Sequence, residues 1–222
     1  MADLIPPKAP NLLIAPPAEY EVKYQEQLNN AQRLYYNSID NGLSSLYGPL
    51  GGQYLSFPHI AASDSTDQYA GGNNTPTVVV WNTLDSGNGF SLAAPGTATC
   101  EASGVYKITY SAQLANTDGA AHDAAFWLKV NSTNVSNSTT IFTLPARKSA
   151  GVPSYVCGYS EVVFTVNTGD EVELWWATDL AATSGGTTGI YILADPAITS
   201  PYSRPAVPSV IGAITFVSSI PA

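Results

Sequence analysis

The sequence predicts a mainly β protein: an antiparallel jelly-roll sandwich of about ten strands, preceded by a proline-rich extended arm and one amphipathic helix. Three observations support this prediction. Short runs in which apolar and polar residues alternate recur through the later part of the chain. From Ala18 to Tyr47, apolar residues recur instead with the period of a helix. Residues 1–17 contain five prolines, which disfavour a helix and favour an extended strip.

The arm over residues 1–17 also carries aliphatic side chains, among them Leu12, Leu13 and Ile14. Exposed aliphatic surface is unfavourable in water, so we expect the arm to lie against another surface, such as a neighbouring subunit. A loose terminus with incidental apolar residues is the alternative.

A helix is expected from Ala18 to Tyr47, and Gly48-Pro49 ends it. Its apolar residues fall at steps of three or four and form one stripe: Tyr24, Leu28, Ala31, Tyr35, Ile39, Leu43 and Leu46. The opposite side is mostly Asn and Gln, so the isolated helix is marginal in water. Burying the stripe at about 1.5 to 3 kcal/mol per residue offsets the ordering cost only against a partner surface. That surface is either the chain's own β-domain or a symmetric bundle or other protein. We therefore predict an anchoring and trimerisation region at residues 1–50 and a jelly-roll domain at 51–222.

The clearest strand is Gly104 to Leu114, in which apolar Ile108, Tyr110, Ala112 and Leu114 alternate with a polar row. We expect its polar row of Lys107, Thr109, Ser111 and Gln113 to face solvent or a polar neighbour. A buried, unpaired Lys107 would contradict that register. Further strands are expected at 53–57, 77–81, 90–92, 98–101, 126–130, 139–144, 154–160, 161–166, 171–176, 190–193 and 209–218, with Gly158 at a bend and an extended strip at 195–208.

The amino-acid composition excludes some classes of binding partner. Only 11% of the 222 residues are charged, and eight Lys and Arg residues leave a formal net charge of −9. Affinity for nucleic acid rests on basic side chains that neutralise phosphates, so neither DNA nor RNA is an expected partner. No apolar run of about 18 residues occurs, so we expect no membrane partner. Cys100 and Cys157 leave two alternatives open, a disulfide across the sheets or two free thiols.

No catalytic, cofactor or metal site is expected. His59 falls in a loop and His122 in a turn, and no Gly-x-Ser-x-Gly motif marks a nucleophile. Glu171 and Glu173 share one strand face, as glycosidase carboxylates can, but a solvated strand face is the commoner meaning of such a pair. The stretch from Asp64 to Gln68 has oxygen ligands without the spacing or glycine of a calcium loop.

Exposed aromatic side chains suggest a different kind of site. Trp175 and Trp176 are consecutive on one strand, so their side chains point to opposite faces of the sheet. One of them therefore lies on an outer face, as a protein contact or a sugar platform, unless the N-terminal arm covers it as a second core layer.

Four segments resemble the globular heads shared by complement proteins and tumour necrosis factor ligands: Gly104–Tyr110, Phe126–Asn131, Val166–Leu174 with its Thr168-Gly-Asp170 turn, and Ile214–Phe216. That family implies a ten-stranded jelly roll that assembles as a trimer, with Gly104 to Leu114 as one of its central strands. The chain from 28 to 217 is also similar to a class of bacteriophage virion proteins, through residues 28–41, 52–59 and 205–211. It differs from the animal heads in lacking their collagen stalk and secretion signal.

These resemblances imply a non-enzymatic virion protein. We expect a homotrimeric capsid cement or decoration protein, made in the host cytoplasm and carried on the capsid surface. Its arm and helix would contact neighbouring subunits and the major capsid protein or another virion protein. A short head or tail fibre protein whose jelly roll binds a host glycan or receptor is the alternative. The expected partner-contact residues are Leu12, Leu13, Ile14, Leu28, Ala31, Tyr35, Ile39, Leu43, Leu46, Trp175 and Trp176.

Overall fold

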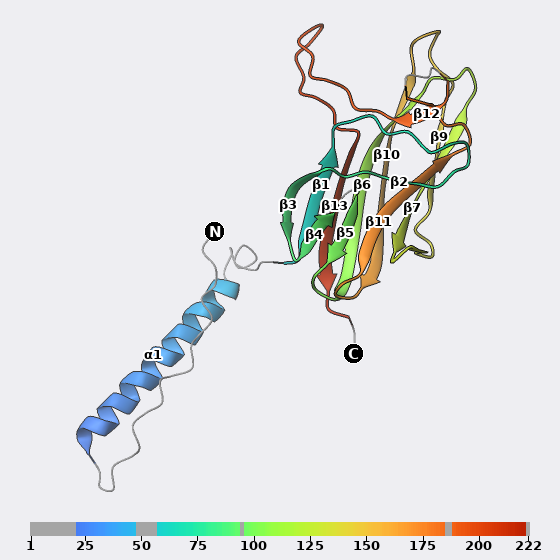
Figure 1. The fold of residues 1–222 in the computed structure, drawn as a ribbon. Helices are drawn as coiled ribbons and strands as arrows, with labels where there is room; N and C mark the ends of the chain where they lie inside the picture. Colours follow the sequence, from blue (N-terminus) through green and yellow to red (C-terminus); the bar gives the residue numbers. More distant parts are fainter. Residues whose placement is uncertain (1–20, 48–56, 94–95, 185–187, 221–222) are drawn as a thin grey trace. The chain divides into compact units, whose positions relative to one another are not determined.

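A computed structural model describes residues 21–47, 57–93, 96–184 and 188–220, with the side chains of residues 45–47 excepted. The chain forms two compact units, Met1–Ser56 and Phe57–Ala222 (Figure 1). The boundary that we predicted at residue 50 falls within 48–56, outside the described residues. No helix in the described ranges is long and apolar enough to cross a membrane.

The described part of the first unit, residues 21–47, forms helix α1 from Val22 to Tyr47. It follows the predicted stripe and ends directly before Gly48. Two side-chain hydrogen bonds support its polar side, from Gln25 Nε2 to Asn29 Oδ1 at 3.1 Å and from Arg33 Nη2 to Asn30 Oδ1 at 3.0 Å. Such pairs at three or four residues' spacing stabilise a helix by only a few tenths of a kcal/mol each.

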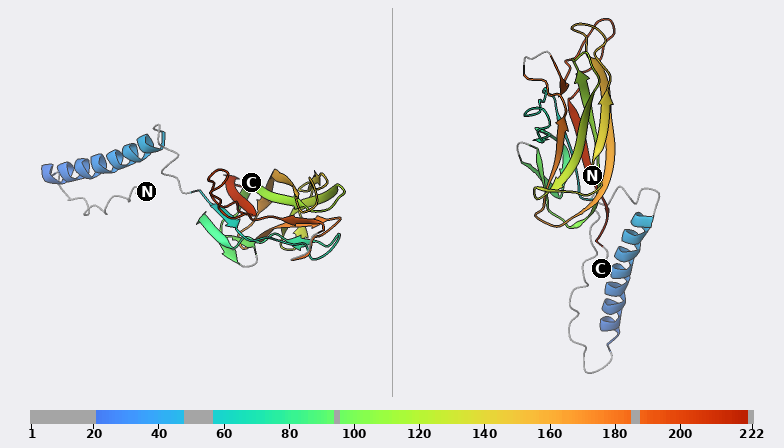
Figure 2. Two further views of the ribbon diagram at one scale, coloured as in Figure 1. Left: turned by 90° about the horizontal axis from the view of Figure 1, so that it is seen from above. Right: turned by 90° about the vertical axis from the view of Figure 1, so that its right-hand side faces the viewer.

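The second unit is a sandwich of two antiparallel sheets, which confirms the predicted fold class (Figures 1 and 2). Sheet A has the order β10-β6-β13-β1-β3, with β12 also paired to β6. Its strands are β1 (His59–Asp64), β3 (Thr83–Asn88), β6 (Gly104–Asn116), β10 (Ser154–Val166), β12 (Ile190–Ile192) and β13 (Val210–Ser218). Sheet B has the order β4-β5-β11-β7-β8, with β2 paired to β11 and β9 to β7. Its strands are β2 (Thr77–Val78), β4 (Phe90–Ala93), β5 (Thr97–Cys100), β7 (His122–Val130), β8 (Thr133–Asn134), β9 (Thr140–Leu144) and β11 (Glu171–Thr178).

Strand β6 is central in sheet A, the position that we expected for it. Ile108 is paired with Val162 of β10 on one side and with Ile214 of β13 on the other. The last strand, β13, lies between β6 and β1 and so closes the middle of the sheet. Because His59 at the start of β1 pairs with Thr215 near the end of β13, both ends of the sandwich segment lie at the same end of the domain.

The core lies between the two sheets and is rich in aromatic side chains. Tyr110 of sheet A stacks on Phe126 of sheet B at a centroid distance of 5.7 Å, and Phe126 stacks on Trp176 at 5.9 Å. All three side chains are buried. Large rings that cross the gap between sheets contribute both buried area and specific geometry, so they hold the two sheets in one relative position.

Two strands lie where the sequence suggested connections. Strand β1 includes His59, which we predicted in a loop, and its inward row is Ile60, Ala62 and Asp64. The inward row ends in Ala62 and Asp64 and the outward row contains Ala61, so the two rows differ little in polarity and the alternation was hidden. Strand β3 is exposed along its whole length and therefore has no apolar row at all. His122 is likewise the first residue of β7 and not part of the preceding turn.

Strand β10 is continuous over 13 residues, so the predicted bend at Gly158 is wrong. Gly158 is buried, and a Cβ atom there would lie 3.0 Å from Cε2 of Phe142. The glycine therefore makes room for the packing of an aromatic ring and does not turn the chain. Cys100 is buried and Cys157 exposed, and both are free thiols. Of the two alternatives for the cysteines, the structure has the free pair.

The proline-rich strip after β12 is folded back on itself. Backbone bridges join Asp195 to Val207 and Ile198 to Arg204, and the Arg204 guanidinium pairs with the carboxylate of Asp195. The strip thus forms a projecting hairpin with an exposed Tyr202 near its tip, where the sequence had predicted only extended chain (Figure 1).

Candidate interaction surfaces

The outer face of sheet A carries large exposed side chains from two strands; we call it the sheet A face. Tyr155, Tyr159 and Val163 project from β10, and Ile211 and Val217 from β13. Tyr159 and Val163 are 59% and 60% exposed. Apolar surface of this kind on a folded domain marks a site of contact when it is contiguous.

Small residues of β6 lie between these two rows. Ser111 is paired with Tyr159 on one side and with Ile211 on the other. A hydroxymethyl group between a ring and a branched side chain leaves a shallow depression of about 130 Å³, which is lined by Thr109, Tyr110, Ser111, Tyr159, Ile211, Gly212 and Ala213. The sheet A face therefore has protruding side chains next to a depression, a shape that can interlock with a complementary surface.

The predicted polar row of β6 lies on this same face. Lys107 is partly exposed, and its Nζ is 3.5 Å from Oε2 of Glu161 on β10. Its partner and exposure fit the register that we predicted. The thiol of Cys157, on the outward row of β10, accepts a hydrogen bond from Gln113 Nε2 at 3.6 Å. Thiol labelling can distinguish the two cysteines, because Cys157 is exposed and Cys100 is buried.

On sheet B, the two consecutive tryptophans are separated as predicted, and Trp176 is the inner one. It is fully buried against Phe126, so it is not available to a partner, and its place among the expected contact residues is wrong. Trp175 lies on the outer face, directly paired with Trp127 of β7. Only the tertiary packing shows which of the two rows of β11 faces the other sheet.

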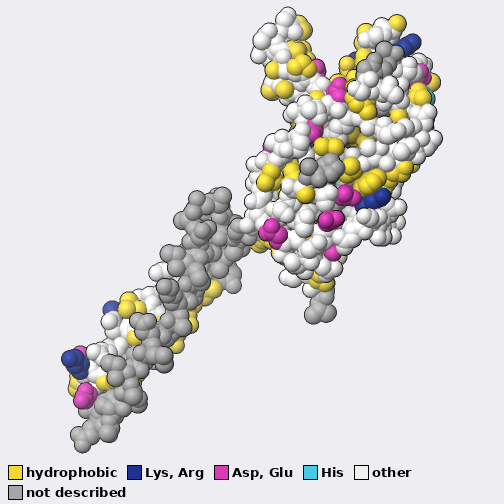
Figure 3. All heavy atoms as spheres, viewed as in Figure 1, with side chains coloured by type: hydrophobic (Ala, Val, Ile, Leu, Met, Phe, Trp, Pro, Cys, Tyr) yellow, Lys and Arg dark blue, Asp and Glu magenta, His cyan; other side chains and the backbone are white. Residues whose placement is uncertain are grey.

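The ring of Trp175 already has polar partners on its own sheet. The Nζ atom of Lys129 lies 3.5 Å from the ring centroid, and the indole Nε1 donates a hydrogen bond to Glu173 Oε2 at 2.9 Å. Glu173 Oε1 accepts a second hydrogen bond from Thr97 at 2.9 Å. Figure 3 shows a basic side chain among apolar ones on this side of the sandwich. A sugar that stacks on Trp175 would have to displace the Lys129 ammonium.

Helix α1 presents apolar side chains on more than one side. Leu28, Ala31, Tyr35 and Ile39 of the predicted stripe are half-buried, and Leu43 is exposed. Val22, Leu34 and Tyr36, which lie off the stripe, are also exposed. The side chain of Leu46 and all of Leu12, Leu13 and Ile14 lie outside the described residues. Among residues 21–44 no side chain is buried, although an amphipathic helix gains its stability from burial.

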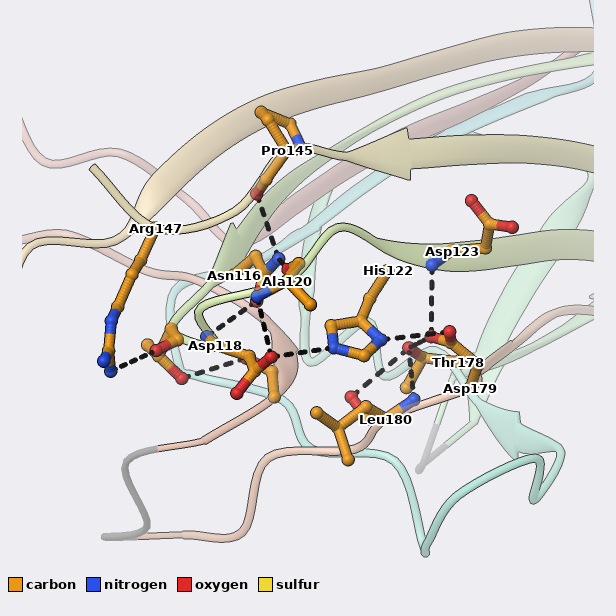
Figure 4. A network of polar contacts seen from close by, with 12 residues as sticks. Asn116, Asp118, Ala120, His122, Asp123, Pro145, Arg147, Thr178, Asp179 and Leu180 are labelled. Carbon is orange, nitrogen blue, oxygen red and sulfur yellow. Dashed lines mark hydrogen bonds and ion pairs between the residues drawn. The ribbon is translucent and has the colours of Figure 1, made fainter. Parts of the chain in front are cut away.

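A polar network lies at the end of the sandwich where β6 passes into β7 (Figure 4). His122 is at its centre: Nδ1 is 3.0 Å from Asp179 Oδ2, and Nε2 is 3.1 Å from Asp118 Oδ2. Burial by itself lowers the pKa of His122, but the hydrogen bonds with Asp179 and Asp118 outweigh it and raise the pKa above its ordinary value.

The same contacts act on the two carboxylates. The backbone N–H of Ala120, and then His122, hold the pKa of Asp118 below its ordinary value. Burial raises the pKa of Asp179, but the hydrogen bonds from His122 and from the backbone N–H of Asp123 outweigh that effect and lower it. Sequence reasoning missed this network because Asp179 is 57 residues from His122.

The structure brings His59 beside a serine. Its Nδ1 is 2.9 Å from the carbonyl oxygen of Phe57, and its Nε2 is 3.1 Å from Ser86 Oγ. A base oriented by a third group and paired with a hydroxyl is the arrangement of an activated nucleophile. Ser86, however, lies on exposed strand β3, and the depression described above is lined by other residues. The pair has the distances of a nucleophile and base, but it does not line that depression.

The predicted oxygen-rich stretch does not converge on a metal. Asp64 Oδ1 accepts hydrogen bonds from the N–H and hydroxyl of Thr66, whereas Asp67 Oδ1 accepts one from the N–H of Ala194. In the described part of the chain, no three His, Cys, Asp or Glu side chains are grouped so as to hold a metal ion.

No protein-family model and no curated protein sequence matches this chain. Solved structures resemble it in fold. One is Eiger TNF from S. frugiperda, with a TM-score of 0.47 and 10% identity, over 76% of this chain and 97% of the other. Another is the globular domain of zebrafish complement 1qA protein, with a TM-score of 0.42 and 16% identity, over 74% and 100%. At these identities the resemblance is one of fold alone.

Proposed function

We propose that this protein is a non-enzymatic structural protein of a bacteriophage virion: a homotrimeric cement or decoration protein on the capsid surface, made in the host cytoplasm. One observation carries the proposal. The sandwich has a complete core, yet the sheet A face and helix α1 both leave large apolar side chains exposed. A chain with such surfaces gains stability by assembly, because burial then removes them from water.

The sheet A face supports the trimer part of the proposal. Its exposed apolar side chains come from β10 and β13, and the charged side chain of β10, Glu161, pairs with Lys107 of β6 within the face. Burying a Tyr159 or a Val163 is worth about 1.5 to 3 kcal/mol each. Repeated in three copies about one axis, that gain outweighs the entropy lost on association when the shapes fit.

Helix α1 supports the capsid part. Its exposed Leu34 and Tyr36, together with the stripe, give it apolar surface on several sides. One side then remains for the major capsid protein or another virion protein after the stripe is buried. The arm residues Leu12, Leu13 and Ile14 are proposed to extend that contact.

Thiol labelling of the native protein tests the trimer. Cys157 lies on the sheet A face, and buried Cys100 serves as the internal control. We expect light scattering at micromolar concentration to give the mass of a trimer, in which Cys157 reacts slowly. Val163→Glu should yield a monomer with a rapidly reacting Cys157. Val152→Glu, at an equally apolar but separate exposed position, should leave the trimer intact. A monomeric native protein would exclude the trimer.

Capsid binding tests the role of the helix. Removal of residues 1–47 should leave the sandwich folded, with unchanged near-ultraviolet circular dichroism, and should abolish decoration of capsids. If the shortened protein still decorates capsids fully, the proposed role of the N-terminal unit is wrong. Copy number separates the two virion locations, because a shell protein is present in far more copies than a tail protein.

The pair of outward tryptophans favours the alternative, a short head or tail fibre protein that binds a host glycan or receptor. Trp175 and Trp127 are directly paired on the outer face of sheet B, and aromatic rings on a rigid sheet suit sugar stacking. A glycan array decides between the two. Binding that is lost in Trp175→Ala, with the fold unchanged, would favour the fibre protein over the capsid protein.

A further inference from the structure

His122 has a carboxylate at each of its two ring nitrogens. Asp179 Oδ2 faces Nδ1 at 3.0 Å, and Asp118 Oδ2 faces Nε2 at 3.1 Å. A neutral imidazole has one N–H and so donates to only one of them, leaving a lone pair opposite the other carboxylate. Only the doubly protonated imidazolium donates to both. The two distances by themselves therefore indicate that the His122 ring is the charged imidazolium.

We propose that His122 is a proton-operated clamp: as an imidazolium it ties the β6–β7 turn, through Asp118, to the end of β11, through Asp179, and loss of its proton releases one of these contacts. This inference does not depend on the proposed function. It concerns segments that are far apart in sequence. The end of β11 is already paired with the start of β7, where the Asp179 N–H donates to the Asp123 carbonyl, whereas through His122 it is also tied to Asp118 in the turn before β7.

Both carboxylates also hold backbone groups, so the clamp acts on more than side chains. Asp118 Oδ2 accepts a hydrogen bond from the N–H of Ala120 at 2.9 Å, and Asp179 Oδ1 accepts one from the N–H of Asp123 at 3.1 Å. A carboxylate that swings away from a neutral ring weakens its backbone bond as well. The amides of Ala120 and Asp123 thus report on the clamp.

The other charged groups around the ring do not replace its charge. Asp123, on β7, is a third carboxylate, and its Oδ1 accepts the hydroxyl of Thr143 on β9 at 2.6 Å. Arg147, from the connection after β9, donates to the carbonyl oxygen of Thr117 at 3.2 Å and not to a carboxylate (Figure 4). Among the described residues the imidazolium is the cation paired with Asp118 and Asp179, so its deprotonation leaves two carboxylates uncompensated.

The direction of the switch follows from the raised pKa of His122. The clamp is closed below the ordinary histidine pKa and opens as the pH rises through the raised value in the folded protein. Mildly alkaline solution should therefore loosen this end of the sandwich, while the core between the sheets stays packed.

Nuclear magnetic resonance on the whole native protein tests the clamp directly. At pH 6 the nitrogen shifts of His122 should show both ring nitrogens protonated. Hydrogen exchange, corrected for its intrinsic pH dependence, should show the protection of at least one of the Ala120 and Asp123 amides falling about tenfold across the titration of His122, as expected for loss of a charge-assisted hydrogen bond.

Variants distinguish the clamp from general alkaline loosening. In His122→Gln the protection of the Ala120 and Asp123 amides should not change with pH, whereas His59→Gln, which alters the other histidine, should keep the native profile. Asp179→Asn leaves the shape of the site nearly unchanged and should lower the midpoint of the His122 titration. A neutral His122 ring at pH 6, or pH-independent protection in the native protein, would overturn the proposal without any variant.

Discussion

Trp81 packs directly against Gly212: a Cβ atom built on the glycine would lie 2.6 Å from Cζ2 of the indole. Trp81 is buried, and Gly212 sits on β13, paired with Tyr110 of β6. The two residues are 131 positions apart in the sequence (212 − 81). Their contact fixes how the segment after β2 lies across sheet A.

We expect Gly212→Ala to lower the free energy of unfolding by about 1 to 3 kcal/mol, because the added methyl group overpacks a rigid ring. Urea unfolding followed by circular dichroism measures this. Gly119→Ala is the matched control, since a Cβ atom there has no atom within 4 Å. Equal effects of the two substitutions would show that the Trp81 contact is unimportant.

Asp170 joins the turn before β11 to the end of β7. Its Oδ2 accepts the N–H of Asn167 at 2.7 Å, and its Oδ1 accepts the side-chain amide of Asn131 at 2.7 Å. The hydrogen bond from Asn167 first, and then that from Asn131, hold the pKa of Asp170 below its ordinary value. Its stabilising effect is therefore complete above the ordinary pKa and is lost as the pH falls through the lowered one.

Asp170→Asn should accordingly cost about 1 to 3 kcal/mol at neutral pH, and the difference from the native protein should shrink in acid. Unfolding midpoints measured from pH 7 to pH 2.5 test both statements. Asp85→Asn, on exposed strand β3, should have little effect at any pH. A difference that stays constant down to the lowest pH would contradict the assignment.

The two adjacent tryptophans should differ sharply when they are removed. Trp176→Ala opens a cavity in the core and should cost about 3 to 5 kcal/mol. Trp175→Ala removes a half-buried ring and its contact with Lys129, and should cost about 1 kcal/mol. Calorimetric melting temperatures of the two variants provide the comparison. The reverse order would mean that the faces of β11 are interchanged.

The contact of Lys129 with the Trp175 ring can be tested separately. Lys129→Met keeps an unbranched chain but removes the charge, so we expect a loss of about 0.5 to 1 kcal/mol that high salt does not abolish. Lys107→Met removes an exposed ion pair with Glu161 and should cost less. Double-mutant cycles with Trp175→Ala and Glu161→Gln measure the two couplings. A zero coupling for Lys129 would show that its position over the ring contributes nothing.

Much of the fold could be predicted from strands in which the row of side chains facing the core is apolar and the row facing outward is polar. In β6 one row is apolar and the other polar, so period and burial agree and the strand is found at its observed place. In β10 both rows contain apolar residues, such as Val162 on one and Val163 on the other, and alternation cannot tell core from surface. The exposed Tyr155 and Tyr159 were therefore missed as candidate contacts. Their spacing of four residues, which places them on one strand face, is the signal that was present.

Local sequence determined that the chain has a stripe-bearing helix and strands of period two, because each depends on neighbours within one element. Tertiary structure decided that Trp176 is inside and Trp175 outside, that Gly158 and Gly212 make room for rings, and that His122 lies between two aspartates. The tryptophan and glycine positions depend on which faces meet across the sandwich. His122 and Asp179, distant in the chain, become neighbours only when β7 and β11 pair within sheet B.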